Sequence, residues 1–218
     1  MPVKLQTKDK VDPVTLEIIQ GKLLSVVDEM AVVMQRTSMS PVIYEVLDFA
    51  CGVCNEKMEL VAQTNGITLF TGTFSTQLRS VVETYKHDQP GDIYVTNDPY
   101  HGGTHACDFA IIRPIFQGSR LVAYALNVAH WVDVGGAVPG SLPPDATSSF
   151  QEGLRLSRIR LARGDVINDE IVRIIRENTR LPDIAMGDLN AQIATVRIAE
   201  TRIGEMLERY GANLLTAS

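Results

Sequence analysis

The chain has 218 residues, of which 45% are hydrophobic and 21% charged, and its formal net charge is −6. This length allows one substantial hydrophobic core or two small domains. The acidic balance and the lack of a basic stripe argue against a nucleic-acid partner. No apolar run is long enough for a membrane span, and the N-terminus lacks the apolar stretch of a signal peptide. We therefore expect a soluble, cytoplasmic protein without a membrane partner.

The three cysteines, Cys51, Cys54 and Cys107, do not suggest a disulfide framework, which fits a reducing compartment. Cys51 and Cys54 form a C-x-x-C pair. A structural zinc site needs a second such pair, and a redox motif belongs where a strand opens into a helix. Because this pair lies inside a run typical of a strand, we expect two core cysteines. Cys107 could be a soft metal ligand, although an inert buried thiol is the favoured interpretation.

The first predicted element is a long helix. Residues 1–11 are polar and are expected to be a flexible N-terminus, and Asp12-Pro13 then supplies an N-cap followed by proline at the first helical position. From Val14 to about Arg36 apolar residues recur at helical spacing, which predicts a packing helix with a wide apolar face. Residues 46–63 predict a hairpin around a short polar turn.

The rest of the chain alternates between helical and extended patterns. A short strand is predicted at 93–95, leading straight into Asn97-Asp98-Pro99. Three further helices are predicted at 75–88, opened by Ser75, at 168–178 and at 187–210. Together the elements predict an α+β fold, in which antiparallel β-hairpins form a sheet packed with long helices, and we expect residues 12–218 to form the N-terminal portion of a metal-binding domain.

A second hairpin matters most for function. Residues 109–116 and 121–128 are typical of strands and flank a short turn that contains Gly118 and Ser119. If the loop has three residues centred on Ser119, Asp108 lies directly opposite His130. Opposed side chains have Cβ atoms about 5 Å apart, which is close enough to share one ion. A two-residue loop would turn His130 to the other face, so the hypothesis depends on this register.

The candidate site combines imidazoles with carboxylates. The chain has only four histidines, and three of them lie close together in the sequence, beside several aspartates. Two imidazoles and a carboxylate are the usual composition of a catalytic metal site, which keeps one position open for water or substrate. We predict one divalent metal ion, zinc or manganese with iron as a further possibility, bound by His105, Asp108 and His130. The candidates for a fourth ligand are Asp48, Asp98 and Asp133, of which Asp98 and Asp133 are also candidates for a supporting catalytic role.

Other sites are weaker or absent. His87 lies in a polar segment and is expected to be structural or exposed, whereas His101 could support the site, contact substrate or be exposed. The glycine- and proline-rich residues 134–141 either line an active site or form a surface turn. Gly102-Gly103 is not part of a phosphate-binding or dinucleotide motif, and the chain has no G-x-S-x-G motif of a serine hydrolase.

A series of motifs covers nearly the whole chain from residue 12 onward. They are Asn97-Asp98-Pro99-Tyr100, Gly102-Gly103-Thr104-His105 with Asp108, Ala129-His130, Gly135-Gly136 with Pro139-Gly140-Ser141, Phe150-Gln151-Glu152-Gly153-Leu154, Asn178-Thr179-Arg180-Leu181-Pro182-Asp183 and Gly187-Asp188-Leu189-Asn190-Ala191-Gln192. In this order the motifs resemble the hydantoinase B/oxoprolinase family. Family members usually run to more than twice this length, so the chain is similar to their N-terminal portion.

The resemblance implies a division of labour between two subunits. A kinase-like alpha subunit, of the hydantoinase A type, would use ATP to phosphorylate the substrate. The beta subunit, which this chain resembles, would act on the activated intermediate at its metal. The positions that match the family's metal ligands are His105, Asp108 and His130, with Asp48 as the expected fourth.

The resemblance leaves three functions open. The first is the metal-bearing beta subunit of an ATP-dependent hydrolase of cyclic amides, such as hydantoins, lactams or oxoproline. The second is the equivalent subunit of an ATP-dependent ketone carboxylase of the acetone or acetophenone type. The third is a non-catalytic fragment that only binds its partner, against which the intact His105, Asp108 and His130 argue.

Overall fold

The computed structural model describes residues 13–64, 66–86 and 88–210. Its helices are α1 (Pro13–Thr37), α2 (Pro41–Tyr44), α3 (Thr68–Thr84), α4 (Asp169–Glu177), α5 (Pro182–Tyr210) and the single turns η1 (Pro99–His101) and η2 (Ser149–Gln151). Its strands are β1 (Phe49–Asn55), β2 (Leu60–Gln63), β3 (Ile93–Thr96), β4 (Asp108–Gln117), β5 (Arg120–His130), β6 (Ile159–Arg163) and β7 (Val166–Ile167). None of these helices is long and apolar enough to span a membrane. The expectations for residues 1–11, for the Asp12 N-cap and for His87 lie outside the described residues.

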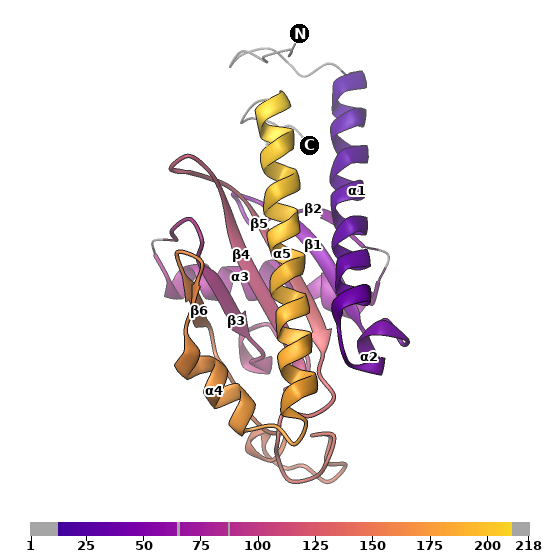
Figure 1. Cartoon of the computed structure of the whole chain (residues 1–218), viewed down its shortest axis with the longest axis vertical. Coiled ribbons are helices and arrows are strands. Elements are labelled where there is room, and N and C mark those ends of the chain that lie inside the picture. Colours follow the sequence, from indigo (N-terminus) through magenta and orange to yellow (C-terminus); the bar gives the residue numbers. More distant parts are fainter. Residues whose placement is uncertain (1–12, 65, 87, 211–218) are drawn as a thin grey trace.

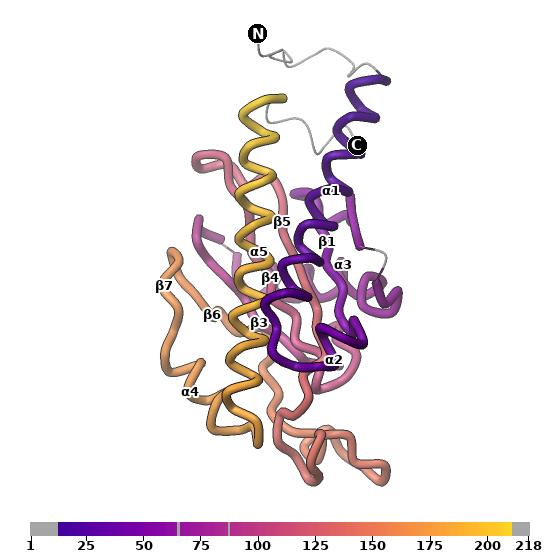
Figure 2. The backbone as a smooth tube through the Cα atoms, turned by 45° about the vertical axis from the view of Figure 1, so that its right-hand side comes forward, coloured from indigo at the N-terminus to yellow at the C-terminus, as the bar shows by residue number. Residues whose placement is uncertain are grey.

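The seven strands of the described residues form one sheet in the order β2-β1-β5-β4-β3-β6-β7. Every pairing between neighbouring strands is antiparallel. Helices cover both faces: α1 and α5 lie side by side over one face, and α3 crosses the other (Figures 1 and 2). This arrangement confirms the predicted α+β fold of antiparallel hairpins packed with long helices.

The two long helices confirm the predictions made from apolar periodicity. α1 ends at Thr37, close to the predicted end, and its buried residues recur at helical spacing on the side that faces the sheet. α5 begins at Pro182 rather than at the predicted residue 187. Proline is favoured in the first turn of a helix because its missing N–H has no helical partner there, so the motif that contains Pro182 starts the helix.

α3 differs from its prediction at both ends. It starts at Thr68 rather than at Ser75 and ends at Thr84 rather than at residue 88. No side chain caps its N-terminus, but Phe70 and Phe74 from its first turns are buried against the sheet. Serine favours N-caps, which is why the prediction began there. Burial of two aromatic rings outweighs that local signal, since each removes a large apolar area from water.

The short elements are partly as predicted. The β1–β2 hairpin, β3 and α4 confirm the predictions, and the side chain of Asn168 caps α4 by accepting from the N–H groups of Glu170 and Ile171. The β6–β7 hairpin was not predicted. Its second strand has two residues, which is too short for an alternating pattern, and it joins the sheet through the pairing of β6 with β3.

The sheet separates two clusters of buried apolar side chains. The larger cluster lies between the sheet and the α1–α5 pair, and the smaller one lies between the sheet and α3. Cys51 belongs to the first and Cys54 to the second, and both thiols are buried and free. Burial raises the pKa of the Cys54 thiol to about 12, so the thiol stays protonated near neutral pH. The prediction of core cysteines is confirmed, and Cys107 is a buried thiol whose pKa is likewise raised to about 12.

Candidate functional site

The β4–β5 hairpin places Asp108 directly opposite His130, as the sequence predicted. The cause differs from the prediction. The turn contains two residues, Gly118 and Ser119, and of these only Gly118 has a positive φ, 62°. A β-bulge then leaves Val122 without an opposite residue. The short turn and the bulge together produce the pairing that a three-residue loop was expected to produce.

Asp108 and His130 bond each other at the end of this hairpin. The Nδ1 atom of His130 lies 2.7 Å from Oδ1 of Asp108. The other carboxylate oxygen accepts hydrogen bonds from the hydroxyl of Thr104 and from the backbone N–H of His105, the latter over 2.8 Å. Asp108 is buried and His130 is partly exposed. The contact with Asp108 occupies Nδ1 and leaves Nε2 of His130 available to a ligand.

The same contacts set the charges of the pair. Burial opposes ionisation of Asp108, but the hydrogen bonds from His130, Thr104 and His105 hold the pKa of its carboxyl below the usual value. Burial also disfavours the protonated form of His130, yet the hydrogen bond and the charge of Asp108 raise the pKa of the imidazole above its usual value. The pair therefore combines a buried carboxylate with an imidazole that accepts a proton readily.

The two other predicted metal ligands, Asp48 and His105, lie beside this pair. The backbone N–H of His130 donates to the carbonyl oxygen of Asp48 over 3.0 Å, which places the residue before β1 next to the end of β5. Burial raises the pKa of the Asp48 carboxyl, on which the charges of His130, Asp108 and His105 also act. The exposed ring of His105 stands edge-on to that of His130, with ring centroids 6.4 Å apart. The four predicted metal ligands thus gather at one end of the sheet.

The donor types of these four residues fit a divalent transition metal, because imidazole and carboxylate bind zinc, manganese and iron. Their arrangement is not a coordination shell. Within the described residues, no group of three His, Cys, Asp or Glu side chains is placed to hold a metal ion. Both oxygens of Asp108 accept hydrogen bonds from their neighbours instead. For Asp108 to bind a metal directly, its contact with His130 has to be exchanged for the ion.

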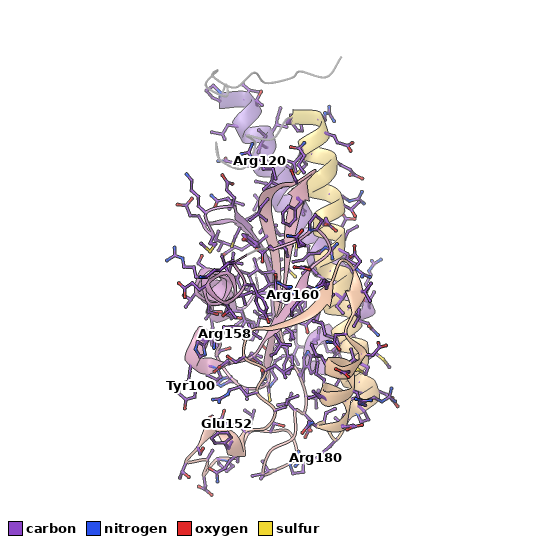
Figure 3. The ribbon with its side chains drawn as sticks, turned by 90° about the vertical axis from the view of Figure 1, so that its left-hand side faces the viewer. Tyr100, Arg120, Glu152, Arg158, Arg160 and Arg180 are labelled. Atoms are coloured by element: carbon purple, nitrogen blue, oxygen red, sulfur yellow. The ribbon has the colours of Figure 1, made fainter. Side chains whose placement is uncertain are left out.

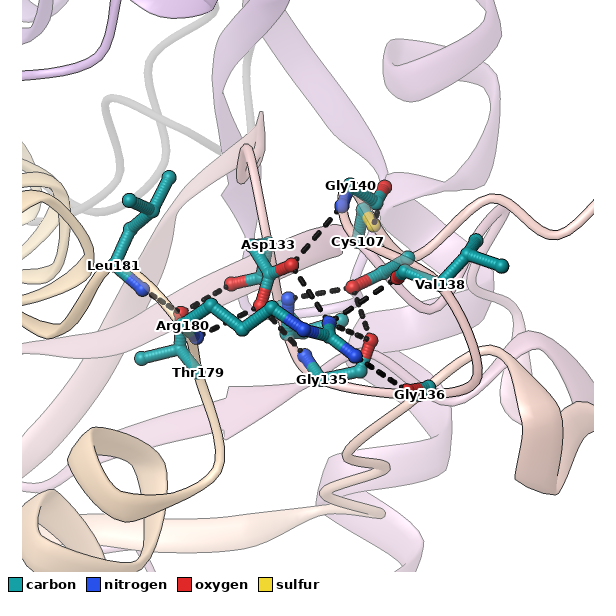
Figure 4. Close-up of polar contacts among 11 residues, drawn as sticks. Cys107, Asp133, Gly135, Gly136, Val138, Gly140, Thr179, Arg180 and Leu181 are labelled. Carbon is teal, nitrogen blue, oxygen red and sulfur yellow. Dashed lines mark hydrogen bonds and ion pairs between the residues drawn. The ribbon is translucent and has the colours of Figure 1, made fainter.

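Asp133 is a candidate for a supporting role or for the fourth ligand. It lies at the centre of a hydrogen-bond network that holds the glycine-rich loop (Figure 4). Its carboxylate accepts hydrogen bonds from the backbone N–H groups of Gly135, Gly140 and Arg180, and from the Arg180 guanidinium over 2.9 Å. That guanidinium also donates to three backbone carbonyls of the same loop. Against the effect of burial, these bonds hold the pKa of Asp133 below its usual value. The glycine-rich loop is therefore held in a defined shape beside the start of α5.

Asp98 has a comparable place in the preceding loop. One oxygen accepts from the backbone N–H of Tyr100 over 3.0 Å, and the other lies 2.7 Å from Nδ1 of His101. Asp98 thereby caps η1 and engages the imidazole of His101. The carboxylate of Asp98 is occupied by groups of its own loop and that of Asp133 by its own loop and Arg180, whereas that of Asp108 is occupied by residues of the candidate site and by Thr104.

Sequence reasoning missed the residues that support the pair. Thr104 was quoted only as part of a motif, yet its hydroxyl donates to Asp108. Gln192 of α5 accepts from the indole N–H of Trp131 over 2.9 Å and donates to the side-chain oxygen of Asn127 over 2.7 Å. Trp131 follows His130 directly, so this buried network fixes the end of β5. Gln192 lies next to the apolar face of a helix that the sequence predicted. A glutamine at such a position is a signal for a buried hydrogen-bond network, because a buried side-chain amide needs partners.

Comparisons with known proteins bear on the whole chain. Residues 12–218 match the family model described as hydantoinase B/oxoprolinase. The putative B-type subunit of D-/L-hydantoinase from Pseudomonas sp. (strain NS671) is 31% identical over 96% of this chain, and the beta subunit of caprolactamase from Pseudomonas jessenii is 29% identical over 95%. This chain spans 36% of the length of each of these two relatives.

Two solved structures share the fold. The ATP-dependent caprolactamase from Pseudomonas jessenii matches with a TM-score of 0.90 at 28% identity, over 96% of this chain and 36% of that one. The nucleotide-free structure of acetone carboxylase matches with a TM-score of 0.89 at 20% identity, over 94% of this chain and 28% of that one, which is a likeness of fold alone. Because the family model covers almost every residue, including all four gathered donors, the chain belongs to the hydantoinase B/oxoprolinase family.

Proposed function

We propose that this chain carries the site at which an ATP-dependent cyclic-amide hydrolase completes its reaction, as the beta subunit of a hydantoinase or lactamase. The observation that carries the proposal is the gathering of Asp48, His105, Asp108 and His130 at one end of the sheet, around a bonded carboxylate–imidazole pair. The relatives are named as subunits of a hydantoinase and of a caprolactamase, which supports a cyclic amide as substrate and a second subunit as partner. In this proposal the partner is a kinase-like alpha subunit that phosphorylates the amide oxygen with ATP.

A component of a ketone carboxylase is the second candidate. The acetone carboxylase structure has the same fold, but its identity with this chain is 20%. The relatives named as hydantoinase and caprolactamase subunits are 31% and 29% identical. We therefore favour a cyclic amide over a ketone.

The proposal gives each of the gathered residues a role. His105, Asp108 and His130 would hold a divalent metal, zinc, manganese or iron, with Asp48 as the fourth ligand. Such an ion supplies Lewis-acid chemistry and makes water nucleophilic near neutral pH. Thr104 and the backbone N–H of His105 would orient the Asp108 carboxylate as a ligand. The contact of Asp108 with Nδ1 of His130 orders the imidazole until the ion replaces it. These hydrogen bonds fix the donors before substrate arrives.

The order of the two half-reactions follows from the substrate. An amide carbon is a poor electrophile, and phosphorylation of its oxygen both activates that carbon and makes the oxygen a leaving group. One water adds to the activated carbon, the ring C–N bond breaks and the nitrogen takes a proton, which leaves an acyl phosphate. A second water converts the acyl phosphate into a carboxylate and inorganic phosphate. The phosphorylated substrate must therefore reach this site before bulk water destroys it.

Elemental analysis of purified protein tests the metal assignment. Because His105 is exposed, its replacement should cost little stability. Protein prepared without chelator is expected to contain near-stoichiometric zinc or manganese, and His105→Ala is expected to lose most of it. The control is His101→Ala, which lies in the same loop but is bonded to Asp98 and should keep the metal. Equal metal content in the parent and in His105→Ala would contradict the assignment.

A further inference from the structure

An arginine stands between two exposed aromatic rings beside the candidate site. The Cζ atom of Arg155 lies 5.7 Å from the ring centroid of Tyr100 and 5.6 Å from that of Phe150. The side chains of Tyr100 and Phe150 are 72% and 82% exposed. Figure 3 shows Tyr100 near Glu152, which follows the turn that contains Phe150, and shows Arg120 at the opposite end of the molecule. Two solvent-exposed aromatic rings that both contact the guanidinium of Arg155 indicate a binding surface.

The backbone around Arg155 is fixed to the loop of the candidate site. The buried side chain of Asn97 donates to the carbonyl oxygens of Ala106, over 2.5 Å, and of Leu154, over 2.8 Å. Its oxygen accepts from the N–H of Leu156 over 2.7 Å. Ala106 directly follows the exposed histidine of the site, and the two leucines flank the arginine. One buried amide therefore joins the backbone on both sides of Arg155 to the backbone next to His105.

The two turns that carry the rings are also fixed by capping. Tyr100 lies in η1, where its N–H is capped by Asp98. Phe150 lies in η2, which is closed by a capping box between Ser148 and Gln151. Both rings therefore project from short turns that are held by capping hydrogen bonds. A surface held in this way loses little conformational entropy when it binds a ligand.

The guanidinium of Arg155 carries a charge that its neighbours leave unpaired. Among the residues that the structure describes, it contacts the two rings but makes no hydrogen bond or ion pair. By contrast, Arg180 is paired with Asp133, and Arg158 donates to the side chain of Ser157. A guanidinium is planar and presents parallel N–H donors that match the oxygens of a phosphate. Arg155 is thus a positioned cation whose donors are available to an anionic ligand.

We propose that Arg155, held between Tyr100 and Phe150, binds the phosphoryl group of the activated substrate at this site. The proposal rests on the proposed function, because the ligand is the phosphorylated cyclic amide that the partner subunit supplies. The guanidinium binds the phosphate oxygens, and the faces of the two rings lie against the apolar part of the substrate. Bound in this way, the activated carbon is retained next to the gathered donors rather than released into water.

Phosphate binding tests this assignment without requiring turnover. Inorganic phosphate is titrated in the absence of ATP into the complete subunit complex, with Arg155→Gln, Arg155→Lys and the control Arg120→Gln beside the wild type. Arg120 is an exposed arginine at the opposite end of the sheet. Arg155→Gln is expected to weaken phosphate binding by about tenfold or more, since a charge-assisted hydrogen bond is lost. Arg155→Lys should retain part of the affinity, and Arg120→Gln all of it.

Several results would overturn the assignment. Unchanged phosphate affinity in Arg155→Gln would show that the arginine only packs against the rings. An Arg155-dependent site that binds acetate as tightly as phosphate would mean that the anion is a carboxylate. Dissociation of the complex in Arg155→Gln, seen by size-exclusion chromatography, with phosphate affinity intact would mean that the three residues form a contact between subunits.

A turnover assay separates this proposal from the proposed function. With ATP and a cyclic amide, Arg155→Gln is expected to form less ring-opened product for each ATP consumed, because the intermediate is retained less well. A wild-type complex that binds phosphate through Arg155 but opens no cyclic amide would contradict the proposed function and leave the anion site standing. A wild-type complex that forms product, with Arg155→Gln equally well coupled, would contradict the Arg155 proposal alone.

Discussion

Asp108 and Asp133 show how hydrogen bonds keep a buried carboxyl ionised. Asp108 accepts from the backbone N–H of His105, the hydroxyl of Thr104 and the ring of His130. Asp133 accepts from three backbone N–H groups and the guanidinium of Arg180. In both cases the pKa lies below its usual value although burial opposes ionisation. The two carboxylates differ in what they hold: Asp108 orients an imidazole of the candidate site, and Asp133 fixes the loop beside it.

Replacing Asp133 with asparagine should destabilise the protein at neutral pH by about 1–2 kcal/mol, because Arg180 and the loop N–H groups lose an anionic acceptor. The folded-state pKa of Asp133 is lowered, so its contribution is present above the unfolded-state value and is lost as the pH falls through the folded-state value. The difference between wild type and Asp133→Asn in urea denaturation should therefore shrink below about pH 4. A difference that is equal at neutral and acid pH would contradict this account.

At the scale of the elements, apolar periodicity predicted the long helices, and tertiary packing decided the rest. α1 and α5 have long periodic faces, so their existence could be predicted, although the start of α5 at Pro182 could not. The start of α3 depends on Phe70 and Phe74 finding space against the sheet, which no local pattern encodes. The two residues of β7 are too few to show any period.

The candidate site was also predictable only where a local sequence pattern marked it. Histidines are rare in this chain, so His105 and His130 stood out, and the hairpin pattern placed Asp108 opposite His130. The bulge at Val122 could not be predicted, because it results from fitting one strand against another. The supporting contact from Gln192 joins segments that are distant in the sequence, and no spacing rule relates them.

Replacing Gln192 with alanine should cost roughly 2–4 kcal/mol of the free energy of unfolding. The indole N–H of Trp131 would lose its acceptor, the side-chain oxygen of Asn127 and the carbonyl of Phe109 would lose a donor, and a cavity would form beneath the sheet. Urea denaturation of Gln192→Ala beside Gln20→Ala, an exposed position on α1, measures the difference. The control should stay within about 0.5 kcal/mol of wild type. An equal effect of the two substitutions would show that the network does not stabilise the fold.

At the scale of the whole molecule, the sheet and the α1–α5 pair form a platform with the site at one end. The loop held by Asp133 and Arg180 lies at the end where α5 begins, away from the end of α5 at Tyr210 (Figure 1). The site is built from the ends of strands and the loops that follow them, while the helices supply rigidity. Of the four candidate ligands, His105 is exposed, Asp48 and His130 are partly exposed and Asp108 is buried, so in the proposed function a substrate from another subunit would reach the site from the side of His105.

The central claim is that this site completes a reaction which a partner subunit starts, and one measurement tests it directly. Phosphate release and ring-opened product are followed side by side in the complete complex, with wild type and Asp108→Asn of confirmed assembly. Asp108→Asn is expected to lower product formation by at least about a hundredfold, because the metal would lose one of its proposed ligands. Substrate-dependent consumption of ATP should continue at least in part, since the proposed function assigns phosphorylation to the partner. Undiminished product from Asp108→Asn that contains no metal would contradict the claim.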